Sequence, residues 1–257
     1  MGGEFFLSIF KTRAIVIRTQ DINENDKLLW LFTEKLGKVS AVARGAKKGK
    51  SKFMASSQLF CYGEYVLYKG KSLYTINEAQ IIDSFQGLLK DLEHITYASY
   101  LCELIQISMQ DEESDRSLFM HLISAFYFMK NEITDIEILA RAFEIKLLKS
   151  TGFSFELEQC IVCGCKISTS DYISCQYGGG VCRDCARVNG IKVSYSAYNA
   201  LRALSKMSFQ NIYRVTLSAQ VKEELYKILS TAIAQNYFKK PKSLETLNYL
   251  KGVIVND

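Results

Sequence analysis

Six of the eight cysteines lie within 26 residues of one another, between Cys160 and Cys185. Four of them form two Cys-x-x-Cys pairs with eighteen residues between the pairs, a spacing typical of a zinc site with four thiolate ligands. Four thiolates complete a tetrahedral shell and leave no position for water or substrate, so we expect one structural Zn²⁺. The expected ligands are Cys160, Cys163, Cys182 and Cys185.

Two further cysteines leave the choice of ligands open, because Cys165 and Cys175 could each replace an expected ligand. The alternatives to a metal site are reduced core cysteines or a redox pair. A thioredoxin-like pair would stand at the start of a helix in a βαβ unit, which this region does not offer. No secretory signal is recognised, so a secreted disulfide framework is not expected.

Composition indicates a globular chain of more than one domain. The 257 residues are 48% hydrophobic and 23% charged, and no apolar run approaches the length of a membrane span. The net charge of +5 is unevenly distributed: residues 1–82 and 159–257 are basic, whereas residues 83–158 are acidic. We therefore expect a cytoplasmic protein without membrane contact, whose zones have different partners.

The first 82 residues contain short β-rich runs separated by glycines, which predicts a small antiparallel barrel. A five-stranded OB barrel fits this size, and an SH3-like barrel remains open on pattern alone. The predicted strands are Thr12–Thr19, Lys27–Thr33, Lys38–Ala43, Leu59–Tyr68 and Ser72–Asn77.

A helical period replaces the β pattern after Ile82. Three amphipathic helices are expected before residue 158, the third with an N-cap at Thr134 and Gly152 near its C-terminal end. Helices at Ser194–Ser205 and Ser218–Phe238 are expected after the cysteines. The predicted fold is thus a multidomain α+β protein: an OB barrel (1–82), a helical domain (83–158 and 193–257) and an inserted zinc module (159–192).

A basic segment interrupts the predicted barrel and contains five cations and no acid in nine residues. Its glycines allow the backbone to follow a phosphate chain, and nearby aromatic residues could stack on bases, although most of these belong to the barrel core. The alternative is a solvated loop. The expected DNA-binding residues are Arg44, Lys47, Lys48, Lys50 and Lys52, with Lys35 and Lys38 as further candidates.

No catalytic motif is recognised. The two histidines, His94 and His121, lie in helical patterns without a zinc-protease or deaminase signature, and no phosphate-binding or nucleophile-elbow motif is present. The chain is therefore not expected to be an enzyme.

Several segments together resemble the RecO family of bacterial recombination mediators. The resemblance rests on Thr12–Ile17, Glu24–Leu28, Phe32–Lys38, Ala43–Lys48, Ser51–Phe53, Leu148–Phe153, the knuckle at Cys160–Gly164 and Tyr177–Cys185. It implies an OB barrel, a helical domain and a zinc module, and so favours OB over SH3-like. The C-terminal segment Lys239–Leu247 resembles the family's lysine-rich ending but departs from its usual Lys-Ser-Arg core, and Glu245 argues against DNA contacts from it.

The resemblance also implies a function: binding of single- and double-stranded DNA, annealing of complementary strands, cooperation with RecR, contact with the single-strand-binding protein, and help in loading RecA. The acidic tail of the single-strand-binding protein is expected to dock on Arg202 and Lys206, beside a helix striped by Val221, Leu225, Ile228 and Ala232. The alternative function is a zinc-ribbon accessory of transcription or DNA topology.

Overall fold

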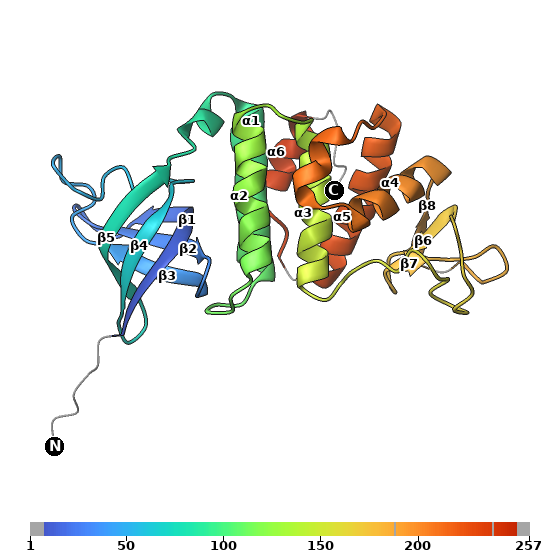
Figure 1. The fold of residues 1–257 in the computed structure, drawn as a ribbon, viewed down its shortest axis with the longest axis horizontal. Coiled ribbons are helices and arrows are strands. Elements are labelled where there is room, and N and C mark those ends of the chain that lie inside the picture. Colours follow the sequence, from blue (N-terminus) through green and yellow to red (C-terminus); the bar gives the residue numbers. More distant parts are fainter. Residues whose placement is uncertain (1–7, 188, 238, 251–257) are drawn as a thin grey trace, which may run out of the picture. The chain divides into compact units, whose positions relative to one another are not determined.

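The computed structural model describes residues 8–187, 189–237 and 239–250. These residues form two compact units, one up to Met120 and the other from His121 onward. In Figure 1 the first unit runs from blue to green and the second from green to red. Each unit is described by itself below.

The first unit contains a closed five-stranded barrel with the strand order β1-β2-β3-β5-β4. β3 and β5 pair in parallel, whereas the other neighbours are antiparallel, so the barrel has the OB arrangement. The predicted OB fold is confirmed. The strands are β1 (Ile9–Asp21), β2 (Lys27–Thr33), β3 (Gly37–Ala43), β4 (Tyr62–Lys69) and β5 (Tyr74–Asp83).

Apolar side chains at alternate positions of the strands fill the barrel interior. On β2, Leu29 and Leu31 point inward and are fully buried, and Ala41 on β3 meets them from the neighbouring strand. Several predicted strand limits are wrong, and β1 runs from Ile9 to Asp21 rather than from Thr12 to Thr19. β4 begins at Tyr62 rather than Leu59, because Phe60 has a left-handed backbone with φ of 69°. β5 continues past Asn77 to Asp83, following its partner β4.

The barrel is followed by a short 3₁₀ turn, η1 (Gln86–Leu89), and by helix α1 (Leu92–Ser108), whose N-cap is Asp91. An acidic connector, residues 109–115, then runs along β3. The backbone N–H of Glu112 donates to the carbonyl of Lys38 at 2.9 Å. A Cβ on Gly37, which has φ of +69°, would lie 2.0 Å from the carbonyl oxygen of Glu113, so only glycine permits this approach.

The second unit is helical. Helix α3 (Ile136–Ser150) packs against α4 (Tyr195–Lys206), α5 (Ala219–Asn236) and the 3₁₀ turn η2 (Phe209–Arg214). Helix α2 (Arg116–Lys130) spans the boundary between the units, and α6 (Ser243–Leu250) follows α5. Among the described residues, no helix is long and apolar enough to cross a membrane.

The predicted helices are all present, with differences at their ends. The N-cap of α3 is Asp135 rather than Thr134, because the Asp135 carboxylate accepts from the N–H groups of Glu137 and Ile138. Gly152 has φ of +87° one residue beyond the C-cap Thr151. The predicted end of α5 at Phe238 lies outside the described residues, and α6 was not predicted.

The cysteine-rich segment forms a separate small module inserted between α3 and α4 (Figure 1). Its sheet has the order β7-β6-β8, built from β7 (Gly179–Gly180), β6 (Tyr172–Ser174) and β8 (Gly190–Lys192). Cys160, Tyr172 and Val181 are its buried core. A core this small needs additional stabilisation, which a metal can supply.

Candidate metal centre and candidate nucleic-acid interface

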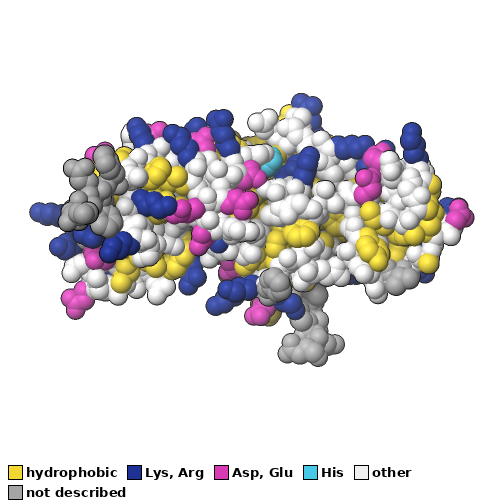
Figure 2. All heavy atoms as spheres, turned by 90° about the horizontal axis from the view of Figure 1, so that it is seen from below, with side chains coloured by type: hydrophobic (Ala, Val, Ile, Leu, Met, Phe, Trp, Pro, Cys, Tyr) yellow, Lys and Arg dark blue, Asp and Glu magenta, His cyan; other side chains and the backbone are white. Residues whose placement is uncertain are grey.

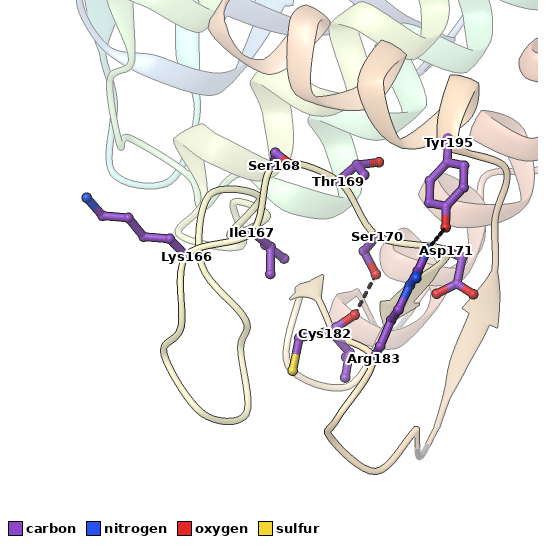
Figure 3. A pocket seen from close by; sticks show the side chains of 10 residues that line it. Lys166, Ile167, Ser168, Thr169, Ser170, Asp171, Cys182, Arg183 and Tyr195 are labelled. Carbon is purple, nitrogen blue, oxygen red and sulfur yellow. Dashed lines mark hydrogen bonds between the residues drawn. The ribbon is translucent and has the colours of Figure 1, made fainter.

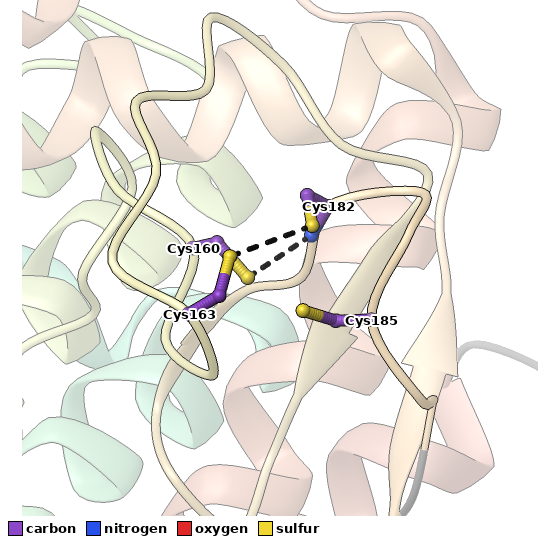
Figure 4. A group of neighbouring side chains, drawn as sticks. All are labelled: Cys160, Cys163, Cys182 and Cys185. Atoms are coloured by element: carbon purple, nitrogen blue, oxygen red, sulfur yellow. Dashed lines mark hydrogen bonds between the residues drawn. The ribbon is translucent and has the colours of Figure 1, made fainter.

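The four expected ligands converge on one point of the inserted module. The sulfurs of Cys160, Cys163, Cys182 and Cys185 all lie within 4.8 Å of one another. Figure 4 shows the four side chains pointing toward one another from two separate loops. The Sγ atoms of Cys163 and Cys182 are 3.8 Å apart. Sulfurs at about 2.3 Å from a tetrahedral zinc are about 3.8 Å apart, so the four residues fit the ion.

The backbone of the first loop holds Cys160 in place for this geometry. Its N–H donates to the carbonyl of Cys165 at 2.8 Å, and its carbonyl accepts from Gly164 at 2.8 Å. Gly164 has φ of +72°, which the tight turn between Cys163 and Cys165 requires. The backbone N–H of Cys182 also donates to the Cys160 sulfur at 3.3 Å, which links the two loops.

The thiols have unequal acidities. Burial opposes ionisation of Cys160, but the N–H groups of Cys182, Cys163 and Val162 outweigh it and lower the pKa of this thiol to about 6. The pKa of Cys185 is raised, mainly by its contact with the Cys182 sulfur. Crowded sulfurs cannot all ionise without a compensating charge, whereas a divalent cation would hold all four as thiolates.

The other cysteines lie outside this group of four. Cys165 is exposed beside it, and its contact with Cys163 raises the pKa of its thiol to about 12. Cys175, Cys61 and Cys102 are buried. The geometry thus favours the four residues of the two Cys-x-x-Cys pairs over Cys165 and Cys175.

The module is attached to α4 through closely fitting contacts. A Cβ on Gly180 would lie 2.3 Å from the hydroxyl of Tyr198, so β7 can approach this ring only if residue 180 is glycine. The Arg202 guanidinium donates to both carboxylate oxygens of Glu158, at 2.6 and 3.1 Å, and to the carbonyl of Ser168 at 2.6 Å. Lys206 also contacts Glu158, at 2.6 Å. Arg202 therefore joins α4 to two segments of the module.

A pocket lies beside the cysteines, and several of its polar groups are engaged in hydrogen bonds, whereas the buried Thr169 hydroxyl has no partner among the described residues (Figure 3). Arg183 donates to the Tyr195 hydroxyl at 2.7 Å, and Ser170 donates to the carbonyl of Val181 at 2.6 Å. Lys166 points away from the pocket in Figure 3. No arrangement of nucleophile, base and oxyanion donor is present among these lining residues.

The basic segment is an ordered loop between β3 and β4. The Asp26 carboxylate accepts from the backbone N–H of Gly45 at 2.7 Å, and this hydrogen bond is the main reason why the pKa of Asp26 is lowered. Lys47 donates through its backbone to the carbonyl of Asn25 at 3.0 Å. The loop is thus fixed on the turn between β1 and β2. Together they line a shallow hollow.

The predicted DNA-binding cations differ in their surroundings. Arg44, Lys48 and Lys50 are exposed, and no carboxylate of the described residues lies within ion-pair distance of them. Lys47 pairs with Asp21 at 2.7 Å, and Lys52 donates to the carbonyl of Asn77 at 2.9 Å. Figure 2 shows basic side chains gathered over the barrel, on the left of the view. The hollow also contains Glu24 and Asp26, so the surface is not uniformly positive.

The two additional candidates lie elsewhere on the barrel. Lys35 is exposed and donates to the carbonyl of Lys11 at 3.1 Å. Lys38 is only 14% exposed; its ammonium contacts the carbonyl of Gln106 at 3.0 Å and Asp111 at 3.2 Å. Lys38 is therefore held by the acidic connector.

Most of the aromatic residues near the basic loop belong to the core, as expected, including Phe53, Phe60 and Tyr65.

The expected docking surface on α5 has a buried apolar stripe. Val221, Leu225, Ile228 and Ala232 are at most 8% exposed and belong to the core of the helical unit. On the same helix, Lys222 pairs with Asp135 at 2.8 Å. The stripe therefore gives α5 its packing face rather than an open groove.

Sequence reasoning missed one contact on the outer face of the barrel. The Arg18 guanidinium lies 4.3 Å from the centre of the Trp30 ring, on adjacent strands of the sheet. Trp30 is the single tryptophan of the chain. The available signal was the alternation on β2, where Trp30 falls between the inward residues Leu29 and Leu31.

An OB barrel with an exposed basic loop, followed by helices and a four-cysteine module, defines a multidomain protein of an architecture common among nucleic-acid-binding proteins. Two family models cover most of the chain: "Recombination protein O N terminal" matches residues 7–85, and "Recombination protein O C terminal" matches residues 89–245. The chain belongs to the RecO family of DNA repair proteins.

Similar proteins match over nearly their full length. "DNA repair protein RecO" of Clostridium novyi is 59% identical over 255 residues, which is 99% of this chain and 100% of that protein. The protein of the same name from Clostridium kluyveri is 55% identical over 96% of both chains. The one from Acetivibrio thermocellus is 32% identical over 95% of this chain and 97% of that protein.

Proposed function

We propose that this protein is a non-enzymatic recombination mediator that binds DNA without sequence preference and anneals complementary strands. The observation that carries the proposal is the ordered basic loop on the OB barrel, where Arg44, Lys48 and Lys50 are exposed and form no close ion pair with a carboxylate of the described residues. Cations held on a fixed backbone contact phosphates at a small entropic cost. Phosphate contacts are shared by single and double strands, so both should bind.

Family membership supports the later steps of the proposal. After binding, the protein would work with RecR, act on strands coated by single-strand-binding protein, and so help RecA to load. Annealing requires that two strands be held close together with their charges partly neutralised, which a cationic loop can do. The work would take place in the cytoplasm, on nucleoid DNA.

The metal we propose for the cysteine group is one Zn²⁺ with a structural role. Four sulfurs that all lie within 4.8 Å suit a tetrahedral, soft-ligand ion. A shell filled by thiolates leaves no position for substrate, which agrees with a protein that is not an enzyme.

For the acidic tail of single-strand-binding protein we keep Arg202 and Lys206 as the proposed contacts. Both now contact Glu158, so the tail would have to displace this carboxylate. Lys206 is 60% exposed and Arg202 30%, so Lys206 is the more accessible of the two.

The proposal is tested by a strand-annealing assay with and without single-strand-binding protein. The wild-type protein should accelerate annealing of complementary oligonucleotides in both conditions. A variant with Lys47, Lys48 and Lys50 changed to Ala should anneal more slowly at the same concentration. Equal annealing by this variant would remove the basic loop from the mechanism, and no acceleration by the wild type would refute the mediator function.

A further inference from the structure

We propose that Trp30, covered by Arg18, is a stacking site for one unpaired nucleobase of bound single-stranded DNA. This inference rests on the proposed DNA-binding function and adds a contact that distinguishes single strands from duplex. It is carried by the position of the pair on the barrel and by its geometry.

The pair lies on the outer face of the first three strands. Arg18 on β1 is opposite Trp30 on β2, and Trp30 is opposite Ser40 on β3. The inward positions Leu29, Leu31 and Ala41 alternate with this face and fill the core. Arg18 is exposed and Trp30 is half-buried, so neither belongs to the barrel interior.

This face leads directly to the basic loop. Ser40 is the cross-strand neighbour of Trp30, and Arg44 follows Ser40 by four residues, in the turn directly after the end of β3 at Ala43. Four residues cover at most about 13 Å when extended. A DNA strand covers that distance in about four nucleotides at the 3.4 Å rise of a duplex, and in fewer when it is stretched. One strand could therefore place phosphates at Arg44 and a base at Trp30.

The geometry of the pair suits replacement by a base. The central carbon of the Arg18 guanidinium lies over the indole ring, 4.3 Å from the ring centre, which is within the range of a cation–π contact. An exposed cation such as Arg18 is held over a ring weakly compared with a nucleobase stacked on an aromatic side chain. The base would take the place of the guanidinium, and Arg18 would move to a neighbouring phosphate.

Charge complementarity favours nucleic acid as the occupant. Arg18, Arg44 and Lys48 are exposed cations on this face and on the loop that follows it. An OB barrel presents the faces of its second and third strands, together with the loop between the first two, to oligonucleotides. Bases in a duplex are already stacked and cannot reach the ring, so the contact should favour single strands.

The test uses the full chain, because Trp30 is its only tryptophan and its emission reports on this site alone. The protein is titrated with oligothymidylate, with an abasic oligonucleotide of equal length, and with a duplex, while binding is followed separately by anisotropy of labelled DNA. We expect oligothymidylate to quench Trp30 emission strongly, and the other two DNAs to bind with little quenching.

Three variants separate the contributions. Trp30→Leu should weaken oligothymidylate binding about tenfold and leave abasic and duplex binding within about twofold. Trp30→Phe keeps a ring and should retain most of the affinity, which covers the case in which the Leu variant folds poorly. Arg18→Gln should keep the quenching and lower the salt slope for single strands by about 0.7. Tyr127→Leu, an exposed aromatic residue of α2, is the matched control and should change nothing.

The outcomes separate this inference from the proposed function. Equal binding of oligothymidylate and abasic DNA, with unchanged Trp30 emission, would refute the stacking site and leave the basic loop as the binding site. Failure of the protein to bind any of the three DNAs would refute both.

Discussion

The Sγ atoms of Cys163 and Cys182 lie 3.8 Å apart, although eighteen residues separate the two Cys-x-x-Cys pairs. This separation is the edge of a tetrahedron of sulfurs around zinc and far exceeds the roughly 2.05 Å of a disulfide bond. The two loops are therefore arranged to share an ion. A metal ion bound there would add stability to the small core around Cys160 and Tyr172.

The purified protein should contain one zinc per chain, measured by metal analysis of material prepared without chelator. Cys182→Ser removes a thiolate and should reduce the zinc content and destabilise the module, because metal binding contributes to its folding free energy. Cys165→Ser, which changes an exposed thiol beside the group, is the control and should keep the zinc. Absence of zinc from the wild-type protein would contradict the assignment.

Arg202→Gln should lower the free energy of unfolding by about 1–3 kcal/mol, because the guanidinium bonds to Glu158 and to the carbonyl of Ser168 are both lost. Lys206→Gln, at a more exposed contact of the same carboxylate, should cost less than about 1 kcal/mol. Thermal or urea denaturation measures both. Equal costs for the two variants would show that Arg202 does not hold the module to α4.

Lys206→Glu should weaken binding of an acidic peptide with the composition of the tail of single-strand-binding protein. The change removes a cation and places a second negative charge beside Glu158, and both carboxylates then repel the peptide. Binding of naked DNA should be unchanged, since Lys206 lies on α4 and not on the barrel. Fluorescence anisotropy of labelled peptide and labelled DNA measures the two affinities. Equal loss of both, or no loss of peptide affinity, would remove this surface from the proposal.

The barrel should lose stability in acid through Glu34. Burial opposes ionisation of this carboxylate, but hydrogen bonds from Arg116 at 2.9 Å and from Arg13 at 2.9 and 3.2 Å lower its pKa below the usual value. A lowered pKa in the folded state stabilises the protein above the unfolded-state pKa of about 4.3, and this contribution disappears as the pH falls through the folded-state value.

Glu34→Gln should therefore reduce stability near neutral pH and flatten its loss below about pH 4.3. Denaturation midpoints from pH 3 to pH 7 provide the comparison. Glu78→Gln, at an exposed position of β5, is a suitable control. A wild-type profile matching that of Glu34→Gln would show that this carboxylate is not the source of the dependence.

Sequence patterns within single segments predicted the individual strands and helices and the group of four cysteines. Alternation such as Leu29, Trp30, Leu31 identified strands, and the cysteine spacing identified the metal group. The resemblance to the family resolved OB against SH3-like, which pattern alone could not, because strand order depends on the non-local pairing of β3 with β5. The cap of α3 was misplaced by one residue, since Thr134 and Asp135 are both good cap residues.

The contacts that the sequence did not reveal join distant residues. Nothing local shows that the acidic connector would lie along β3 and hold Lys38 through Asp111, or that Arg202 would be engaged by Glu158. The stripe on α5 has the same pattern whether it is buried or exposed, and only packing shows that it is buried. The stacked pair of Arg18 and Trp30 depends on cross-strand register, which a bulge after Val16 shifts.

The most direct test of the account is the salt dependence of single-strand binding. With about five phosphate contacts, the logarithm of affinity should fall with the logarithm of salt concentration at a slope of about −3 to −4. Changing Lys47, Lys48 and Lys50 to Ala should flatten the slope by about 2 for every DNA sequence tested. The matched variant, with the exposed Lys166, Lys192 and Lys239 changed to Ala, should keep the wild-type slope. An unchanged slope in the first variant, or equal flattening in both, would contradict the assignment of DNA binding to the basic loop.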